Sequence, residues 1–246
     1  MRRFFVSPEE IKDNKIYLQG TDARHLSQVL RIKAGEKIIA IDGTGSEYQV
    51  QLTMISDSLA EGIITGVTSS ARDAGIDVTL VQGIPKGDKM ELIIQKCTEL
   101  GVKRIVPVVT ERTIVKLDEG KKEKRRDRWQ KIAREASKQC KRGTVPEITA
   151  ICTWEEYLGF LDRSEEVLVL WEDEAAIGLK GYLTEKLKPD AITLIIGPEG
   201  GLSLDEVNKL AGRGAQTVSL GPRILRTETA GFAALIMVLY EFGDLG

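Results

Sequence analysis

Two glycine-proline loops lie one predicted strand apart near the end of this 246-residue sequence. Gly197-Pro198 follows an apolar run at residues 192–196, and Gly221-Pro222 follows one at residues 216–220. Each run has strand character, and each loop precedes a segment with helical periodicity. Glycine admits a close backbone approach to a ligand, and ligands of open α/β sheets bind at strand ends. One such turn is usually structural, but the pair predicts a ligand pocket.

The second part of the chain alternates between strand and helix patterns from residue 78 onward. Strands are predicted at residues 78–81, 105–109, 167–171, 192–196 and 216–220. Helices are predicted at residues 88–100, 129–140, 204–212 and 228–242. This alternation predicts an α/β domain with a parallel sheet that helices cover on both faces. The last helix is apolar on nearly every side, which predicts burial within the domain or against a second subunit.

The first part of the chain is predicted to be a small β-rich unit. Short apolar runs, glycine turns and the alternation of Tyr48, Val50 and Leu52 indicate strands, with one helix over residues 21–31. Together these features predict a compact barrel. A small, polar stretch near residues 69–75 is typical of a linker. We therefore divide the chain into domains at residues 1–72 and 73–246.

The composition and the missing motifs exclude several classes of protein. No apolar run approaches the ~20 residues that span a bilayer, so a cytoplasmic protein without membrane contact is expected. The three cysteines have no metal spacing and His25 is the single histidine, so no metal site is predicted. Walker A and nucleophile-elbow motifs are absent, and the first turn of the α/β domain lacks a dinucleotide-binding glycine pattern.

The net charge of −2 conceals a strong local asymmetry. Residues 121–142 hold 11 Lys/Arg and 3 Asp/Glu, so this segment alone carries +8. Such a segment on an otherwise acidic protein suggests contact with a polyanion. A solvated helix face with internal charge pairs is an equally good interpretation of the run taken by itself.

Several segments resemble one family of RNA-modifying enzymes. GPEGGLS from Gly197 and LGPRILRTETA from Leu220 are similar to the cofactor-binding region of the SPOUT, or trefoil-knot, RNA methyltransferases. MRRFF at the start, HLSQVLRIKAGE near residue 30, GDKMELIIQKCTELGV from Gly87 and ERTIVK from Glu111 narrow the resemblance. Together they resemble the RsmE-type 16S ribosomal RNA uridine-N3 methyltransferases.

The resemblance implies a fold, a cofactor and a set of binding residues. The expected fold is a parallel-sheet SPOUT domain with a deep trefoil knot, preceded by a PUA-like RNA-binding barrel. The expected cofactor is S-adenosylmethionine, held among three strand-end segments. Its predicted contacts are Leu170, Trp171, Glu172, Ile196, Gly197, Pro198, Gly200, Gly201, Leu220, Gly221, Ile224, Leu225 and Arg226. For Trp171, a place in the pocket and a place in the core are equally compatible with the sequence.

The chemistry of uracil suggests the catalytic groups. N3 carries a proton that must leave, and the resulting charge spreads onto the flanking oxygens. Arg226 is a permanent cation suited to stabilise that charge. Glu199 or Glu228 could accept the proton if burial raised the pKa of its carboxyl, although a first-turn residue that complements the helix dipole is the preferred interpretation for Glu228.

Charge and family position assign the RNA contacts and partners. The predicted RNA-binding residues are Arg2, Arg3, Arg24, Arg31, Arg112, Lys138 and Arg142. The resemblance implies 16S ribosomal RNA in the small ribosomal subunit as substrate and a homodimer as the assembly. Two alternatives are a related knotted transfer-RNA methyltransferase, for example one acting on a ribose 2′-hydroxyl, and an RNA-binding or assembly factor without catalysis.

Overall fold

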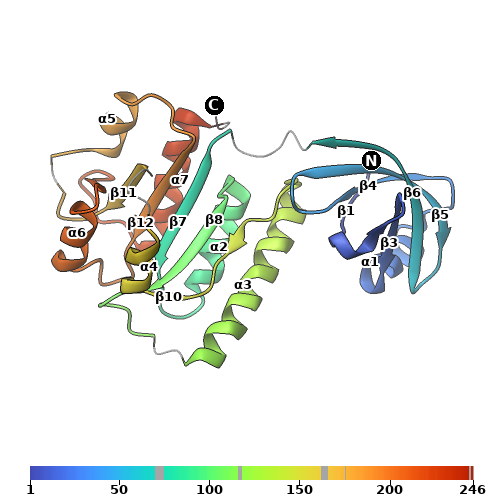
Figure 1. Cartoon of the computed structure of the whole chain (residues 1–246), viewed down its shortest axis with the longest axis horizontal. Helices are drawn as coiled ribbons and strands as arrows, with labels where there is room; N and C mark the ends of the chain where they lie inside the picture. Colours follow the sequence, from blue (N-terminus) through green and yellow to red (C-terminus); the bar gives the residue numbers. More distant parts are fainter. Residues whose placement is uncertain (70–74, 116–117, 162–165, 175, 244, 246) are drawn as a thin grey trace. The chain divides into compact units, whose positions relative to one another are not determined.

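The chain folds into two compact units. The structure is a computed structural model that describes residues 1–69, 75–115, 118–161, 166–174, 176–243 and 245. One unit comprises Met1–Asp73 with Ser137–Val145, and the other comprises Ala74–Ala136 with Pro146–Gly246. Most of the linker expected at residues 69–75 lies outside the described residues. Each unit has its own sheet, and each is described by itself below (Figure 1).

A short segment from the middle of the chain belongs to the first unit. The division at residue 72 assigned residues 137–145 to the second domain, whereas they cluster with the first unit. Thr144 forms bridges with Gly43 and Thr44, and the Val145 N–H donates to the Gly43 carbonyl at 3.1 Å. The sequence around Thr144 has no apolar periodicity, so its pairing partner is set by the tertiary fold.

In its described residues, the first unit is built around a six-stranded sheet. In sheet order its strands are β1 (Arg3–Phe5), β4 (Lys37–Ile41), β5 (Ser46–Ile55), β6 (Leu59–Ser69), β3 (Lys15–Gln19) and β2 (Ile11–Lys12). β1 pairs with β4 in parallel and the other pairs are antiparallel. The predicted helix over residues 21–31 is observed as α1 (Gly20–Arg24) and a π-helical turn (His25–Val29), which buries Leu26 in the core.

The second unit contains the predicted parallel sheet. In sheet order its strands are β10 (Cys152–Thr153), β8 (Arg104–Val109), β7 (Asp77–Gly83), β12 (Ala191–Ile196), β11 (Glu166–Leu170) and β13 (Gln216–Val218), and β9 (Glu147–Ile148) also pairs with β8. All of these pairs are parallel. Residues 192–196 are all buried, as expected for a parallel strand covered on both faces.

In the described part of the chain, six helices accompany this sheet. They are α2 (Lys89–Leu100), α3 (Glu119–Cys140), α4 (Trp154–Phe160), α5 (Leu179–Thr184), α6 (Leu204–Ala211) and α7 (Thr227–Phe242). α2 ends where Gly101 adopts φ +116°, a left-handed conformation that suits glycine. α3 begins well before the predicted residue 129 because its first half is so highly charged that no apolar period marks it.

In the second half of the sheet, the order of the strands in space differs from their order in the chain. β12 precedes β13 in the chain, yet β11 lies between them in the sheet. After β13, α7 returns to contact α2, α5, β7 and β12. Residues 219–226 therefore run from β13, at the edge of the sheet, back to the end of β12, where Thr227 contacts Gly197. The trefoil knot itself stays a prediction of the resemblance.

The last helix is only partly buried. Ala234, Leu235, Val238 and Leu239 have no exposed surface, whereas Ile236 and Tyr240 are 43% and 70% exposed. The expectation of a helix buried all round is thus met on one face within this chain. Among the described residues, no helix combines the length and hydropathy needed to cross a bilayer.

Candidate functional site

Three loops meet where neighbouring parallel strands end. Leu170, the last residue of β11, is in register with Ile196 at the end of β12 and with Val218 at the end of β13. The segments that follow these strands therefore leave the sheet at the same edge. Both predicted glycine-proline loops lie there, together with the residues after Leu170. This is the edge of a parallel sheet at which ligands bind.

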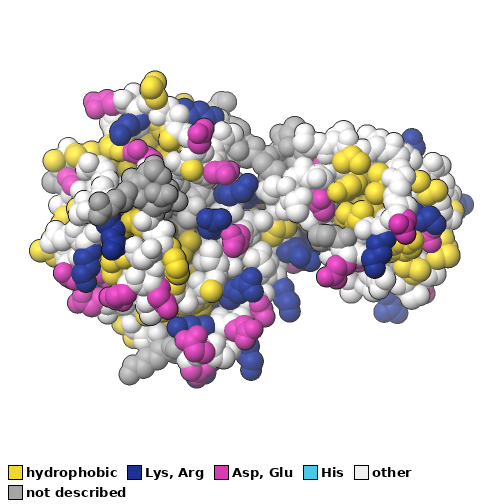
Figure 2. Space-filling view, viewed as in Figure 1, with side chains coloured by type: hydrophobic (Ala, Val, Ile, Leu, Met, Phe, Trp, Pro, Cys, Tyr) yellow, Lys and Arg dark blue, Asp and Glu magenta, His cyan; other side chains and the backbone are white. Residues whose placement is uncertain are grey.

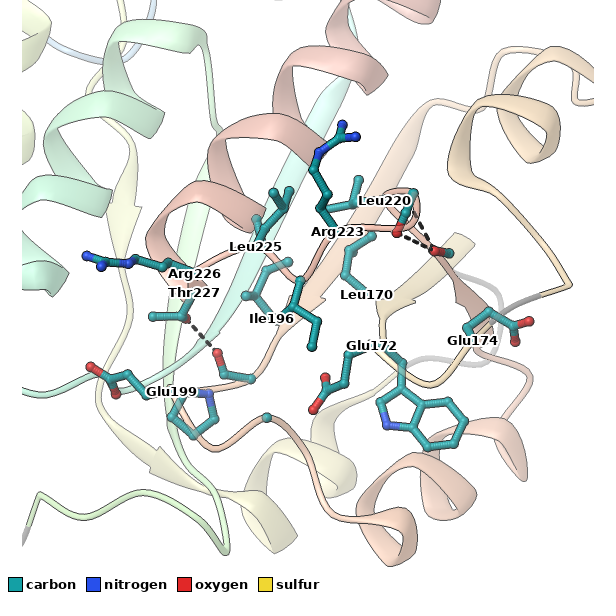
Figure 3. Close-up of a pocket in the computed structure, with 18 of the residues that line it drawn as sticks. Leu170, Glu172, Glu174, Ile196, Glu199, Leu220, Arg223, Leu225, Arg226 and Thr227 are labelled. Carbon is teal, nitrogen blue, oxygen red and sulfur yellow. Dashed lines mark hydrogen bonds between the residues drawn. The ribbon is translucent and has the colours of Figure 1, made fainter.

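A buried hydrogen-bond network joins two of these loops. The Thr227 hydroxyl, in the first turn of α7, donates to the Gly197 carbonyl at 2.6 Å (Figure 3). The Gln82 side-chain amide, at the end of β7, donates to the Thr227 oxygen at 2.9 Å and to the Gly83 carbonyl at 2.9 Å. Gln82 and Thr227 are both buried. Because partnerless buried polar groups are costly, this network fixes the second loop against the first.

Two glycines are required by the backbone of these loops. A Cβ on Gly197 would lie 2.7 Å from the Gly201 carbonyl carbon, so no side chain fits between the two ends of the first loop. Gly221 has open space around it but adopts φ +105°, a conformation that other residues rarely adopt. The first loop therefore needs glycine for close packing, and the second needs it for its turn.

The loops enclose a cavity of about 800 Å³, which lies within the size range of small-molecule sites. The residues that line it are Lys89, Leu170, Trp171, Glu172, Glu174, Gly178, Ile196, Gly197, Pro198, Glu199, Gly201, Ser219, Leu220, Gly221, Pro222, Arg223, Ile224, Leu225, Arg226, Thr227 and Ala230. Figure 3 shows Arg226 and Glu199 on one side and Glu172 and Glu174 toward the other. The cavity thus combines apolar strand ends with charged groups at its two sides.

The charged groups on the Arg226 side are partly neutralised by each other. Lys89 Nζ lies 2.8 Å from Glu199 Oε1 and 3.8 Å from Glu228 Oε2. The hydrogen bond to Glu199 raises the pKa of Lys89 above its ordinary value. Burial raises the pKa of the Glu199 carboxyl, but hydrogen bonds from Lys89 and from the Lys86 backbone outweigh burial, so that its pKa lies below the ordinary value. Glu199 is therefore a carboxylate at neutral pH, and the raised pKa on which its role as proton acceptor was made conditional is not found.

Most residues predicted for the cofactor line this cavity. All predicted positions on the strand-end segments do so except Gly200, which faces elsewhere. A Cβ on Gly200 would lie 3.2 Å from Arg112 Cβ, and Arg112 Nη1 donates to the Gly200 carbonyl at 2.7 Å. Both predicted catalytic residues, Arg226 and Glu199, also line the cavity. Trp171 does so as well, and it also packs against the core cluster behind it.

Some lining residues were not predicted. Lys89 and Thr227 lie inside motifs that were noted, GDKMEL and RTETA, but neither was assigned to the site. Their position at the start of a helix that follows a strand was an available signal. Glu174, Gly178 and Ser219 carried no comparable pattern. Gln82, which supports the cavity from β7, was noted only for the absence of a dinucleotide motif.

The predicted RNA-binding residues of the first unit have different environments. Arg3 makes two hydrogen bonds with Glu47, at 2.6 and 2.8 Å, and Arg142 is buried with a hydrogen bond to Thr144. Arg2, Arg24 and Arg31 are exposed, and Lys138 is half-buried at the end of α3. Arg3 and Arg142 thus have structural partners within their unit, while Arg2, Arg24 and Arg31 are available at its surface.

The described residues contain no group of three or more His, Cys, Asp or Glu side chains that could hold a metal ion. The buried thiols are also unsuited to ionisation, because burial raises the pKa of Cys152 to about 11 and that of Cys97 further.

Comparison with known proteins identifies both units. Residues 72–239 match the RNA methyltransferase domain family, and residues 18–65 match the RNA methyltransferase PUA domain family. Ribosomal RNA small subunit methyltransferase E of Bacillus subtilis (strain 168) is 34% identical, over 98% of this chain and 97% of that protein. The same-named protein of Synechocystis sp. is 34% identical over 96% of this chain and 76% of its own length.

Two solved structures hold a cofactor. Ribosomal RNA small subunit methyltransferase E from Neisseria gonorrhoeae, bound to S-adenosyl methionine, matches with TM-score 0.86 and 34% identity over the full length of both chains. A putative methyltransferase from Legionella pneumophila, in complex with the cofactor SAM, matches with TM-score 0.82 and 31% identity over 99% of this chain and 98% of that one.

The buried network gives a testable stability prediction. Thr227→Val keeps the side-chain shape but leaves the Gly197 carbonyl and the Gln82 amide without this partner, which costs ~1–3 kcal/mol. Thr227→Ser retains the hydroxyl and loses one methyl group, about 0.8 kcal/mol. Urea unfolding followed by tryptophan fluorescence measures this, because Trp129, Trp154 and Trp171 all lie in the second unit. Equal stability of the Val variant and the wild type would contradict the role of the network.

Proposed function

The chain belongs to the RNA methyltransferase family, and from this membership we propose that it transfers a methyl group from S-adenosylmethionine to N3 of a uridine in 16S ribosomal RNA. The observation that carries the proposal is the cavity formed by three strand-end loops, in a chain similar over its full length to a ribosomal RNA methyltransferase that holds this cofactor. We further propose that the substrate is the assembled small subunit and that the enzyme works in the cytoplasm.

The cavity fits this cofactor in size and charge. S-adenosylmethionine is a nucleoside with a cationic sulfonium and an ammonium group. Glu172 lines the cavity as an exposed carboxylate beside Gly201 and complements positive charge. Backbone groups of Leu220, Ile224 and Leu225 would read the edge of the adenine, because recognition of a flat base needs fixed donors and acceptors. When bound, the cofactor supplies an electrophilic methyl group.

The chain's own residues then handle a proton and a charge. Uridine N3 gains a reactive lone pair only when its proton leaves. We assign the proton to Glu199, whose carboxylate lines the cavity in ionised form. Arg226, the N-cap residue of α7, lies on the same side of the cavity and stabilises the charge that spreads onto the uracil oxygens. The base must be presented unstacked to reach this position.

One face of α3 is suited to the phosphates of the RNA. Trp129, Ala133 and Ala136 bury one side of this helix. Lys124 and Lys131, seven residues apart, project from the opposite side, because this spacing returns to the same face. Arg134 lies beside them and is also exposed, and Figure 2 shows Lys and Arg side chains gathered over α3. These cations add to the RNA contacts predicted above, namely Arg2, Arg3, Arg24, Arg31, Arg112, Lys138 and Arg142.

The exposed apolar face of α7 supports a homodimer. Ile236 and Tyr240 are large side chains left open to solvent on a helix whose other face is fully buried. Contiguous apolar surface of this kind commonly marks an interface between proteins. We propose that α7 contributes to the contact between two copies of the chain.

A methylation assay tests the proposed function. Each reaction contains the protein, labelled S-adenosylmethionine and one substrate. The three substrates are small ribosomal subunits lacking the modification, naked 16S RNA and bulk transfer RNA. Nucleoside mass spectrometry is expected to recover 3-methyluridine from the small subunit. Label in transfer RNA, or at a ribose hydroxyl, would instead identify a different knotted methyltransferase. Cofactor binding without methylation of any RNA would favour a non-catalytic factor.

Replacement of Arg226 tests its role as a stabilising cation. Arg226→Ala is expected to lower kcat by about 100-fold, the loss typical for removal of one group that stabilises charge in a transition state. Arg226→Lys keeps the charge without the planar fork and should recover part of that loss. Calorimetric titration with S-adenosylmethionine separates a catalytic defect from a binding defect. Normal methylation by the Ala variant with the cofactor bound would exclude the role.

Neutralising the exposed face of α3 tests the RNA contact. The double variant Lys131→Gln, Arg134→Gln should weaken RNA binding and lower the slope of log K against log salt by about 1–2, close to one unit for each lost phosphate contact. Lys121→Gln is the matched control, because Lys121 lies in the same helix but is paired with Asp118 at 2.7 Å. If Lys121→Gln weakened RNA binding as much as the double variant, the net charge of the protein, and not this face of α3, would determine RNA binding.

A further inference from the structure

Lys89 lies in the cavity wall although it was not assigned to the site from the sequence. It is the first residue of α2, and it reaches two carboxylates from two other segments. Its ammonium group lies 2.8 Å from Glu199, in the first loop, and 3.8 Å from Glu228, in the first turn of α7. One side chain thus connects α2 with the first loop and with the first turn of α7.

The segment between β7 and α2 supplies another partner of Glu199. The Lys86 backbone N–H lies 3.2 Å from Glu199 Oε1 and 3.3 Å from Oε2. Together with the Lys89 ammonium, this N–H fixes the orientation of the carboxylate at the cavity wall. Glu199 keeps 29% of its side chain exposed, so the fixed carboxylate remains open to a substrate.

Glu228 is a second, largely buried carboxylate that is paired with the positive charge of Lys89. Its side chain is only 13% exposed, and Oε2 accepts no hydrogen bond from any described residue. This carboxylate does not line the cavity, so it is poorly placed to reach a substrate. Its nearest cation in an ion pair is the same Lys89 that holds Glu199. Without Lys89, the carboxylates of Glu199 and Glu228 would lose the cation that both of them contact.

Other charged groups nearby do not replace Lys89. Arg226 is close enough to oppose protonation of Lys89, yet it forms no ion pair with Glu199 within the described part of the chain. Arg112 donates to the Gly200 carbonyl, and Glu172 lies beside Gly201. Among described residues, Lys89 is therefore the cation that directly contacts Glu199.

We propose that Lys89 is a positioning residue of the methyl-transfer reaction, which keeps Glu199 ionised and aimed at the cavity so that it accepts the N3 proton of the substrate. The inference rests on the proposed function. It also assigns Glu228 a supporting role as the second carboxylate held by the same ammonium group.

Removing Lys89 is expected to change how activity depends on pH. An opposite charge in contact favours the ionised carboxylate, and a second carboxylate nearby disfavours it. In Lys89→Met, the acid limb of the kcat profile should therefore move to higher pH. Lys89→Arg should restore the wild-type profile, because it keeps the cation. Lys96→Met is the matched control, because Lys96 lies seven residues along α2 in an ion pair with Glu99 at 2.9 Å.

Two further measurements distinguish a positioning role of Lys89 from a general loss of structure in the Lys89→Met variant. If Lys89 acts through Glu199, adding Lys89→Met to Glu199→Gln should not lower kcat further. The carboxyl carbon of Glu199, assigned by its loss in Glu199→Gln, should titrate at higher pH in Lys89→Met than in the wild type by NMR. This titration requires no catalysis, so it tests the ion pair even if the methylation assay disproves the proposed reaction.

The outcomes are distinct. An upward shift in both the kcat profile and the NMR titration, restored by arginine and absent in Lys96→Met, supports the inference. An unshifted titration, a profile unchanged from wild type, or a full additional loss in the double variant would overturn it. A wild-type enzyme that methylates no uridine would reject the proposed reaction, and with it the role of Lys89 in proton transfer.

Discussion

The hydrogen bond from the Thr227 hydroxyl to the Gly197 carbonyl links parts of the sheet that would otherwise end separately. Gly197 follows β12, and Thr227 begins the helix after β13, with β11 between these strands in the sheet. Gln82 adds β7 to the same network. Because these groups are buried, each needs its partner, and the cost of losing one keeps the two loops at a fixed separation. The shape of the cavity depends on that separation.

Paired charges beside the cavity are a second constraint on the site. Lys89, Arg226, Glu199 and Glu228 carry two positive and two negative charges within one small region. A wall with balanced charge neither repels a cationic cofactor nor traps the phosphates of an RNA. It also leaves a cation and a carboxylate that can each respond to a change of charge on a bound base. The strongly basic α3 lies outside this wall, so attraction of RNA and chemistry on a base are assigned to different residues.

The sequence predicted a helix, strand or loop where a single local pattern, such as an apolar run or a glycine-proline pair, determines it. Apolar runs located the longer strands of the parallel sheet but not the two-residue strands β9 and β10. The loops at Gly197 and Gly221 located its ligand-binding edge. The start of α3 was missed because its charged first half has no apolar period. Residues 137–145 were assigned to the wrong side of the domain boundary because the pairing of Thr144 with Gly43 depends on tertiary contact. Lys89 was missed for the same reason, since its two partners lie more than 100 residues away in sequence.

Gly200 shows what a motif predicts and what it does not. The sequence GPEGG indicates that the whole loop faces a ligand, and its other predicted members do line the cavity. Gly201 adopts φ +68°, whereas Gly200 lies against Arg112 instead of the cavity. The two neighbouring glycines therefore serve different contacts, one with the cavity and one with the segment after β8. A motif identifies the loop that binds, whereas the backbone dihedral angles within it decide which residues meet the ligand.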